Sequence, residues 1–254
     1  MRILKSDIYI NEKLTIQPVT KDMLSDYKKP YADEETIRFI EEKNLVWNPL
    51  SKCYDCDRDV DISDDIVSDG KIKIRFGHVK GYFNCSYSNL TTLEGAPKEV
   101  SGSFYCNNNK LTTLEGAPNV VGVSFHCNRN NLTTLEGAPQ KVGLNFFCFN
   151  NKLTTLEGAP KEVGGDFSCS GNNLTTLEGA PNKVGRHFYC NNNNLTTLEG
   201  APKEVGGIFR CNFNKLTTLE GAPQEVSGDF DCSNNPNLVL PKEKPSWIKG
   251  EIIC

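Results

Sequence analysis

The phrase LTTLEGAP occurs seven times in this chain of 254 residues, and each copy follows the last at an interval of 21 residues. It forms the end of a longer repeated pattern, V-x-x-x-F-x-C-x-x-N-x-L-T-T-L-E-G-A-P. A fixed period of this length indicates a solenoid, because one such unit can bury its apolar side chains only against its neighbours. The sequence therefore predicts a stack of about eight rungs over residues 79–240.

The pattern also predicts how each rung is built. Around F-x-C, apolar and variable residues alternate, which indicates a short strand with Phe and Cys facing inward. The Asn falls where the chain must turn, where its buried amide can satisfy unpaired backbone groups and stacked copies can bond to one another. Gly-Ala-Pro then gives a flexible joint and a fixed φ, so the rung ends there. The turn asparagines are Asn109, Asn130, Asn151, Asn172, Asn193, Asn214 and Asn235.

Eight of the eleven cysteines follow the same period. Equivalent thiols on neighbouring strands, about 4.8 Å apart, come within disulfide range, but their parallel side chains give poor bridging geometry. We therefore expect a row of reduced, buried thiols that pack as small hydrophobic groups, which favours a reducing cytoplasm. The row consists of Cys85, Cys106, Cys127, Cys148, Cys169, Cys190, Cys211 and Cys232.

The stretch F-x-C-x-x-N-x-L-T-T-L resembles the leucine-rich repeat core L-x-L-x-x-N-x-L-x-x-L, with Phe and Cys in place of the two strand leucines. Its 21-residue length and Pro-ended turn are similar to the short bacterial effector class, and LTTLEGAP followed by KEV-GG-F-C resembles leucine-rich repeat proteins of tailed bacteriophages. The chain departs from the family in two places. Val100 and its equivalents lie four residues before Phe, where the family has its first leucine three before, and Ser88 replaces the first Asn.

This resemblance covers residues 79 to about 240. It implies a leucine-rich repeat solenoid that is curved, with a parallel β-sheet on the concave face and irregular convex turns. It also implies a binding role without enzyme activity, since the ligase domain of some bacterial relatives has no counterpart after residue 240.

The two ends should cap the stack, because terminal rungs of a solenoid need cover. Residues 1–78 predict a small α+β cap, with a hairpin from DIYI and KLTI, a helix after Thr20, a second helix from Asp33 and strands in YDCDRDVDIS and KIKIRF. Residues 241–254 should cover the other end with Trp247, Ile248, Ile252 and Ile253.

Motifs that carry metal or nucleophile chemistry are weak in this chain. Cys53 and Cys56 form a C-x-x-C pair, but a closed zinc site needs four ligands and the chain has no second pair. We interpret them as packing cysteines. The three histidines, His78, His126 and His187, accompany no recognisable nucleophile motif. We expect no metal, no cofactor and no catalytic residue.

Two acidic patterns also favour a plain structural interpretation. The aspartates at alternate positions from Asp55 to Asp61 resemble a calcium loop, but Val60 stands where that loop needs Gly and Ile66 where it needs Glu. A strand fits better, with the aspartates in water and Val60 and Ile62 buried. The glutamates from Glu94 to Glu220, at the same period of 21, predict a solvated edge.

Composition limits the partners. The 28 Lys and Arg residues against 32 Asp and Glu give a net charge of -4, which argues against nucleic-acid binding. No apolar run is long enough to cross a bilayer, and the first residues lack the apolar core of a signal peptide. We expect a cytoplasmic protein that binds no membrane. The oligomeric state stays open.

The residue between Phe and Cys differs from rung to rung, although the scaffold is copied. Alternation points this column outward, onto the concave face. Drift at relaxed positions favours small or polar residues, yet half of the column is aromatic or His. Exposed aromatic and Arg side chains are typical of protein-binding hot spots. The candidate binding residues are Tyr105, His126, Phe147, Tyr189 and Arg210, with Arg129, Phe149, His187 and Phe213 beside them.

The outward column predicts a cytoplasmic binding protein. The resemblance to phage leucine-rich repeat proteins implies that it is phage-encoded and binds or blocks a host protein, such as a defence component. Two alternatives remain open. A structural, virion-associated part would self-associate or copurify with particles. An enzyme seated in residues 1–78 would hold a metal or ligand there.

Overall fold

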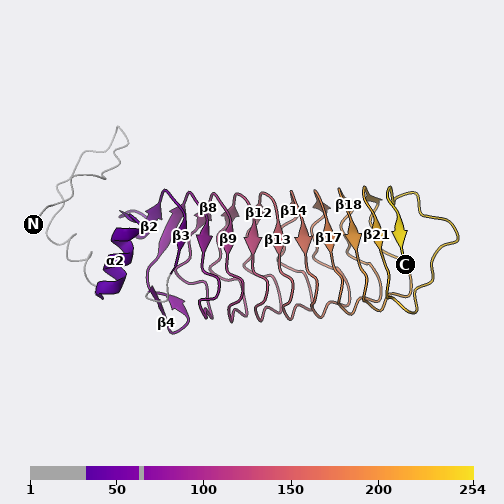
Figure 1. Ribbon diagram of the computed structural model, residues 1–254, viewed down its shortest axis with the longest axis horizontal. Coiled ribbons are helices and arrows are strands. Elements are labelled where there is room, and N and C mark those ends of the chain that lie inside the picture. The colour runs from indigo at the N-terminus through magenta and orange to yellow at the C-terminus, as the bar shows by residue number, and fades with distance from the viewer. Residues whose placement is uncertain (1–32, 63–65) are drawn as a thin grey trace, which may run out of the picture.

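The computed structural model describes residues 33–62 and 66–254. The predicted hairpin and the helix after Thr20 lie outside these residues. The described chain is a solenoid of parallel rungs, as the period of 21 predicts, and Figure 1 shows a long rod with helix α2 (Glu34–Glu42) at one end.

One strand of each rung joins a parallel ten-stranded sheet, which faces the viewer in Figure 1. Equivalent residues lie side by side, so that Phe125 pairs with Phe104 on one side and with Phe146 on the other. The strands are β3 (Val60–Asp61), β7 (Phe83–Asn84), β9 (Phe104–Tyr105), β11 (Phe125–His126), β13 (Phe146–Phe147), β15 (Phe167–Ser168), β17 (Phe188–Tyr189), β19 (Phe209–Arg210), β21 (Phe230–Asp231) and β22 (Ile252–Ile253).

A second set of strands, not predicted from the sequence, runs through the Val column. Val121 pairs with Val100 and Val142, so the valine four residues before Phe belongs to a separate sheet, which accounts for its offset from the leucine-rich repeat pattern. One sheet holds β1 (Val46–Asn48), β2 (Cys53–Cys56), β6 (Phe76–Val79), β8 (Glu99–Val100), β10 (Val120–Val121) and β12 (Lys141–Val142); another holds β14 (Glu162–Val163), β16 (Lys183–Val184), β18 (Glu204–Val205) and β20 (Glu225–Val226). A small hairpin pairs β4 (Val67–Ser68) with β5 (Lys71–Ile72).

The core is a set of ladders made from the copied letters. The Phe rings from Phe83 to Phe230 stack with neighbouring centroids 5.1 to 5.6 Å apart. All eight cysteines of the row are buried and free, as predicted. The Cys85 thiol donates to the carbonyl of Tyr105 in the next rung at 3.2 Å, and several later thiols repeat this bond. Parallel stacking therefore places each core side chain against the equivalent side chain of the next rung.

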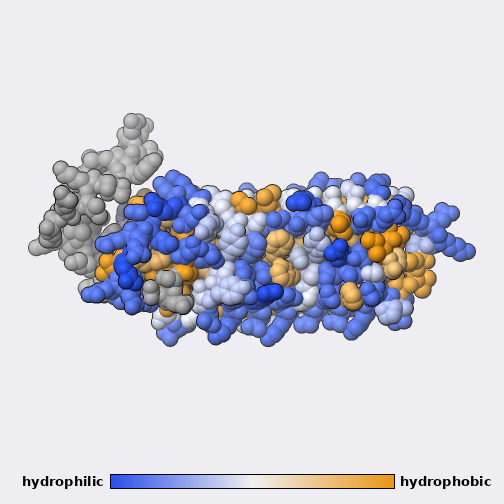
Figure 2. Space-filling model, in the orientation of Figure 1, coloured by the Kyte–Doolittle hydropathy of each residue, from blue (hydrophilic) through white to orange (hydrophobic). Residues whose placement is uncertain are grey.

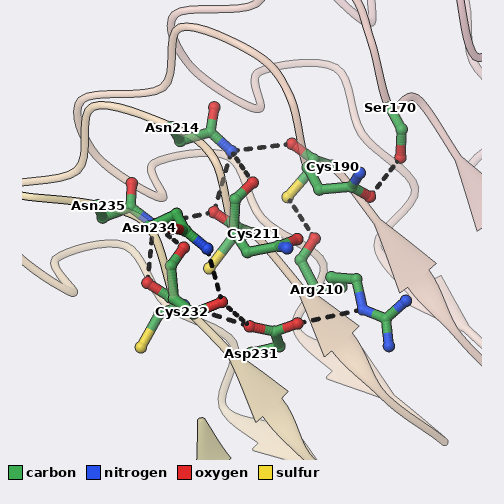
Figure 3. A network of polar contacts seen from close by, with 12 residues as sticks. Ser170, Cys190, Arg210, Cys211, Asn214, Asp231, Cys232, Asn234 and Asn235 are labelled. Carbon is green, nitrogen blue, oxygen red and sulfur yellow. Dashed lines mark hydrogen bonds and ion pairs between the residues drawn. The ribbon is translucent and has the colours of Figure 1, made fainter. Parts of the chain in front are cut away.

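The turn asparagines join adjacent rungs through their side-chain amides (Figure 3). The Asn214 amide nitrogen donates to the carbonyls of Cys190 at 3.1 Å and Cys211 at 3.0 Å, and its oxygen accepts the Leu195 N–H. The asparagines were also expected to bond to one another. That bond runs from the Asn130 backbone N–H to the Asn151 side-chain oxygen, because the amide nitrogens are occupied by carbonyls.

The ends continue the stack. The predicted second helix forms as α2, and Asp33 caps it by accepting the Thr36 N–H at 2.7 Å. Strands β2, β3 and β6 already belong to the large sheets, so the sheets begin before residue 79. At the other end Trp247 packs edge-on against Phe230, and β22 pairs with β21. Ile248 is buried and Ile252 packs on the core, whereas Ile253 is 45% exposed.

Candidate functional site

The outer face of the ten-stranded sheet carries the variable column. The Phe and Cys of each repeat are buried in the core, so the residue between them points outward. The five central candidates lie one per strand on this face: Tyr105 on β9, His126 on β11, Phe147 on β13, Tyr189 on β17 and Arg210 on β19.

Five rings form a continuous series on the N-terminal half of this face, which we call the aromatic row: Tyr82, Tyr105, His126, Phe147 and Phe149. Successive centroids lie 6.1, 4.6, 5.0 and 6.3 Å apart. The contact between Tyr105 and His126 is a stack, whereas the other three meet edge to face. These rings support one another across four rungs and present a rigid, mainly aromatic surface.

A second group, the arginine cluster, lies on the C-terminal half and consists of His187, Tyr189, Arg210 and Asp231. The Arg210 guanidinium lies 5.6 Å from the Tyr189 ring centroid and 3.3 Å from the Asp231 carboxylate (Figure 3). The His187 ring lies 5.8 Å from that of Tyr189, and its Nδ1 accepts the Ile208 N–H. Arg210 is therefore held in one orientation by a ring and a carboxylate.

One rung separates the aromatic row from the arginine cluster. Its outward residue is Ser168 on β15, which is buried, and Ser170 follows it. Because two rungs span about 10 Å, no ring reaches from Phe147 to Tyr189. The five central candidates therefore fall into two groups that do not touch. Figure 2 shows hydrophilic residues interrupting the apolar ones along this face.

Two candidates lie off the sheet. Arg129 and Phe213 occupy the turn after it, with φ of 56° and 54°. Four other rungs hold Asn here, a non-glycine residue that is enriched in the left-handed region. Phe213 is 52% exposed in this turn, beside the outer face of the sheet.

His126 provides a pH test of this packing. Burial lowers its pKa to about 4, so the ring is neutral at pH 7. An unfolded histidine titrates at about 6.5 and so binds a proton first. The stabilisation from neutral His126 is complete above that pH and is lost as the pH falls toward 4. We expect an NMR titration of the ring, assigned with His126→Gln, to show this low pKa. A midpoint near the ordinary value would contradict the stacked arrangement.

Within 33–62 and 66–254, no three His, Cys, Asp or Glu side chains gather closely enough to hold a metal ion. Cys53 and Cys56 are buried, and their thiols donate to the carbonyls of Ser51 and Lys43.

The two acidic patterns belong to the solenoid scaffold. The aspartates on alternate positions were expected in water, but Asp55 and Asp61 are half-buried. They are drawn in because they accept hydrogen bonds from the next rung: Asp55 from the His78 N–H at 2.8 Å, and Asp61 from Asn84. The glutamate column from Glu94 is exposed, as predicted.

Sequence reasoning missed a hollow at the N-terminal end of the outer face. Tyr82, Tyr87 and Tyr105 line it together with Asp61, Asn84 and Asn107. Asp61 comes from β3, which pairs with β7 but lies 23 residues before it, so the period of 21 does not reveal the contact. The sequence held one signal of this contact. Val60 and Asp61 in β3 have the same apolar-then-polar order as Phe83 and Asn84 in β7.

This fold and its repeated rungs define a parallel β-solenoid repeat protein. No protein-family model, no curated protein and no solved structure matches the chain. None of the helices in the described part of the chain is long and apolar enough to span a membrane.

Proposed function

We propose that this protein is a non-enzymatic binding module that recognises a partner protein through the outer face of its ten-stranded sheet. One observation carries the proposal. The buried scaffold is nearly identical in every rung, whereas the outward column changes at each rung and gathers rings and Arg into the aromatic row and the arginine cluster. Aromatic and Arg side chains held in fixed orientations are the usual anchors of protein interfaces.

The partner and setting belong to the same proposal. The repeats resemble those of tailed-bacteriophage leucine-rich repeat proteins, in which case the outer face is the concave face and the partner is a host protein that is bound or blocked in the cytoplasm. Reduced thiols buried along the whole stack suit a reducing compartment. The gap at Ser168 implies that the partner makes two separate contacts, one with each group.

The test is an affinity capture from a bacterial lysate with the intact protein, and the partner is identified by mass spectrometry. The variant carries Tyr105→Ala, Phe147→Ala and Tyr189→Ala together. We expect it to lose at least about 30-fold in affinity for that partner, since one hot-spot truncation costs about 2 kcal/mol or more.

The matched control truncates three exposed glutamates on another surface, Glu115, Glu157 and Glu199, to Ala. It should capture the partner as well as the unmodified protein. Equal capture by the aromatic variant, with its circular dichroism unchanged, would overturn the proposal. Recovery of the protein only as a self-assembly or on particles would support the structural alternative.

A further inference from the structure

The hollow at the N-terminal end of the outer face combines aromatic rings with a fixed carboxylate. Tyr82 and Tyr105 meet edge to face, and Tyr87, which is 69% exposed, stands in the turn beside them. The Asp61 carboxylate accepts the Tyr82 hydroxyl at 2.8 Å and the Asn84 amide at 2.9 Å. One bond reaches each carboxylate oxygen, and each oxygen keeps a further acceptor position.

The charge around the hollow is negative. Asp59 accepts the Tyr82 N–H nearby, and the hydrogen bond to Asp61 raises the pKa of the Tyr82 phenol, which therefore stays protonated and neutral. The outward positions of β3, β7, β9 and β11 carry no Lys or Arg, and His126 is neutral at pH 7. Lys80 is paired with Asp57 at 2.8 Å.

We propose that this hollow binds a cationic side chain of the partner, an arginine whose guanidinium lies against the tyrosine rings and points a donor at Asp61. A guanidinium suits the site because it is planar, weakly hydrated and able to stack on a ring while it donates to a carboxylate. The inference deepens the proposed function and rests on it only for the source of the arginine. It also distinguishes the two halves of the face, because the arginine cluster already contains its own paired cation.

The test uses the full chain labelled with nitrogen-15 and two short peptides, acetyl-Gly-Arg-Gly-amide and its citrulline counterpart, which has nearly the same shape without the charge. We expect the arginine peptide at millimolar concentration to shift the backbone amide signals of Tyr82, Asn84 and Tyr105. The citrulline peptide should bind at least about fivefold more weakly, as expected for a cation on partly exposed rings and a carboxylate.

Two variants examine the hollow itself. Asp61→Asn removes the charge, and Tyr87→Asn installs the residue that other rungs carry at this turn, where Asn108 and Asn150 have nearly the same φ. Each should weaken arginine binding by about threefold to fivefold. The matched control is Glu157→Gln, which removes one carboxylate from the exposed glutamate column, away from the hollow, and should leave binding unchanged.

The proposal is overturned if the citrulline peptide binds as well, if the shifts spread along the glutamate column, or if no shift appears. Such a result would not contradict the proposed function, because the triple aromatic variant tests the outer face separately, with the captured partner. Conversely, binding of the arginine peptide by a protein that captures no partner would support the hollow and contradict the proposed function.

Discussion

Raising the pH above about 9 is expected to unfold this protein, whereas most domains tolerate that change. The cause is the buried thiol row. Seven thiols, from Cys85 to Cys211, have no exposed surface, and burial raises their pKa far above the ordinary value because a thiolate is poorly solvated in the core. At the end of the row burial raises the pKa of Cys232 to about 12.

The direction of the effect follows from proton binding. Below about pH 8.5 the thiols are protonated in both states, so their contribution to stability is fully present. Above that pH the unfolded thiols lose protons and the folded ones do not, so each buried thiol lowers the free energy of unfolding by about 1.4 kcal/mol per pH unit. Seven of them together lower it by about 10 kcal/mol per unit, which equals the whole stability of a typical domain.

The measurement is urea unfolding followed by circular dichroism at several pH values between 7.5 and 10, in the presence of a thiol reductant. A variant with Cys148→Ala and Cys169→Ala isolates the thiol contribution from that of Lys and Tyr. Its stability should fall less steeply, by about 3 kcal/mol per pH unit. An identical pH dependence of the two proteins would show that the thiol row does not drive alkaline unfolding.

Replacement of one central turn asparagine, Asn151→Leu, is expected to remove about 2 to 6 kcal/mol of stability. Its amide donates to the carbonyls of Cys127 and Cys148, and its oxygen accepts the N–H groups of Asn130 and Leu132. Leucine fills the space but leaves the N–H groups of Asn130 and Leu132 unpaired, and each costs about 1 to 3 kcal/mol. The two carbonyls still accept a bond from the neighbouring turn asparagines, Asn130 and Asn172. The loss is large because the amide joins two rungs in the middle of the stack.

The control is Lys152→Ala, which changes the next, exposed residue and should alter stability by less than about 0.5 kcal/mol. Urea unfolding gives the global value, and hydrogen exchange gives the local one: the amides of Asn130 and Leu132 should exchange far faster in Asn151→Leu. Unchanged protection of those two amides would mean that the amide does not hold the turn.

Part of the candidate site was predictable because its residues repeat with the scaffold. Alternation around F-x-C placed Tyr105, Phe147 and Arg210 on one outer face, and the structure has them on one sheet. Spacing does not say which side chains touch. It therefore missed that Ser168 separates two groups, and that Arg210 is held by Tyr189 and Asp231.

The sequence by itself determined the solenoid, the inward Phe and Cys ladders and the buried turn asparagines, because an exact period of 21 lets every rung pack against a copy of itself. Tertiary structure alone decided the second set of sheets through the Val column and the hollow formed by Asp61 with Tyr82 and Asn84. These depend on how rungs are placed side by side. Strand β3 lies outside the period, so only the folded chain shows which residues it meets.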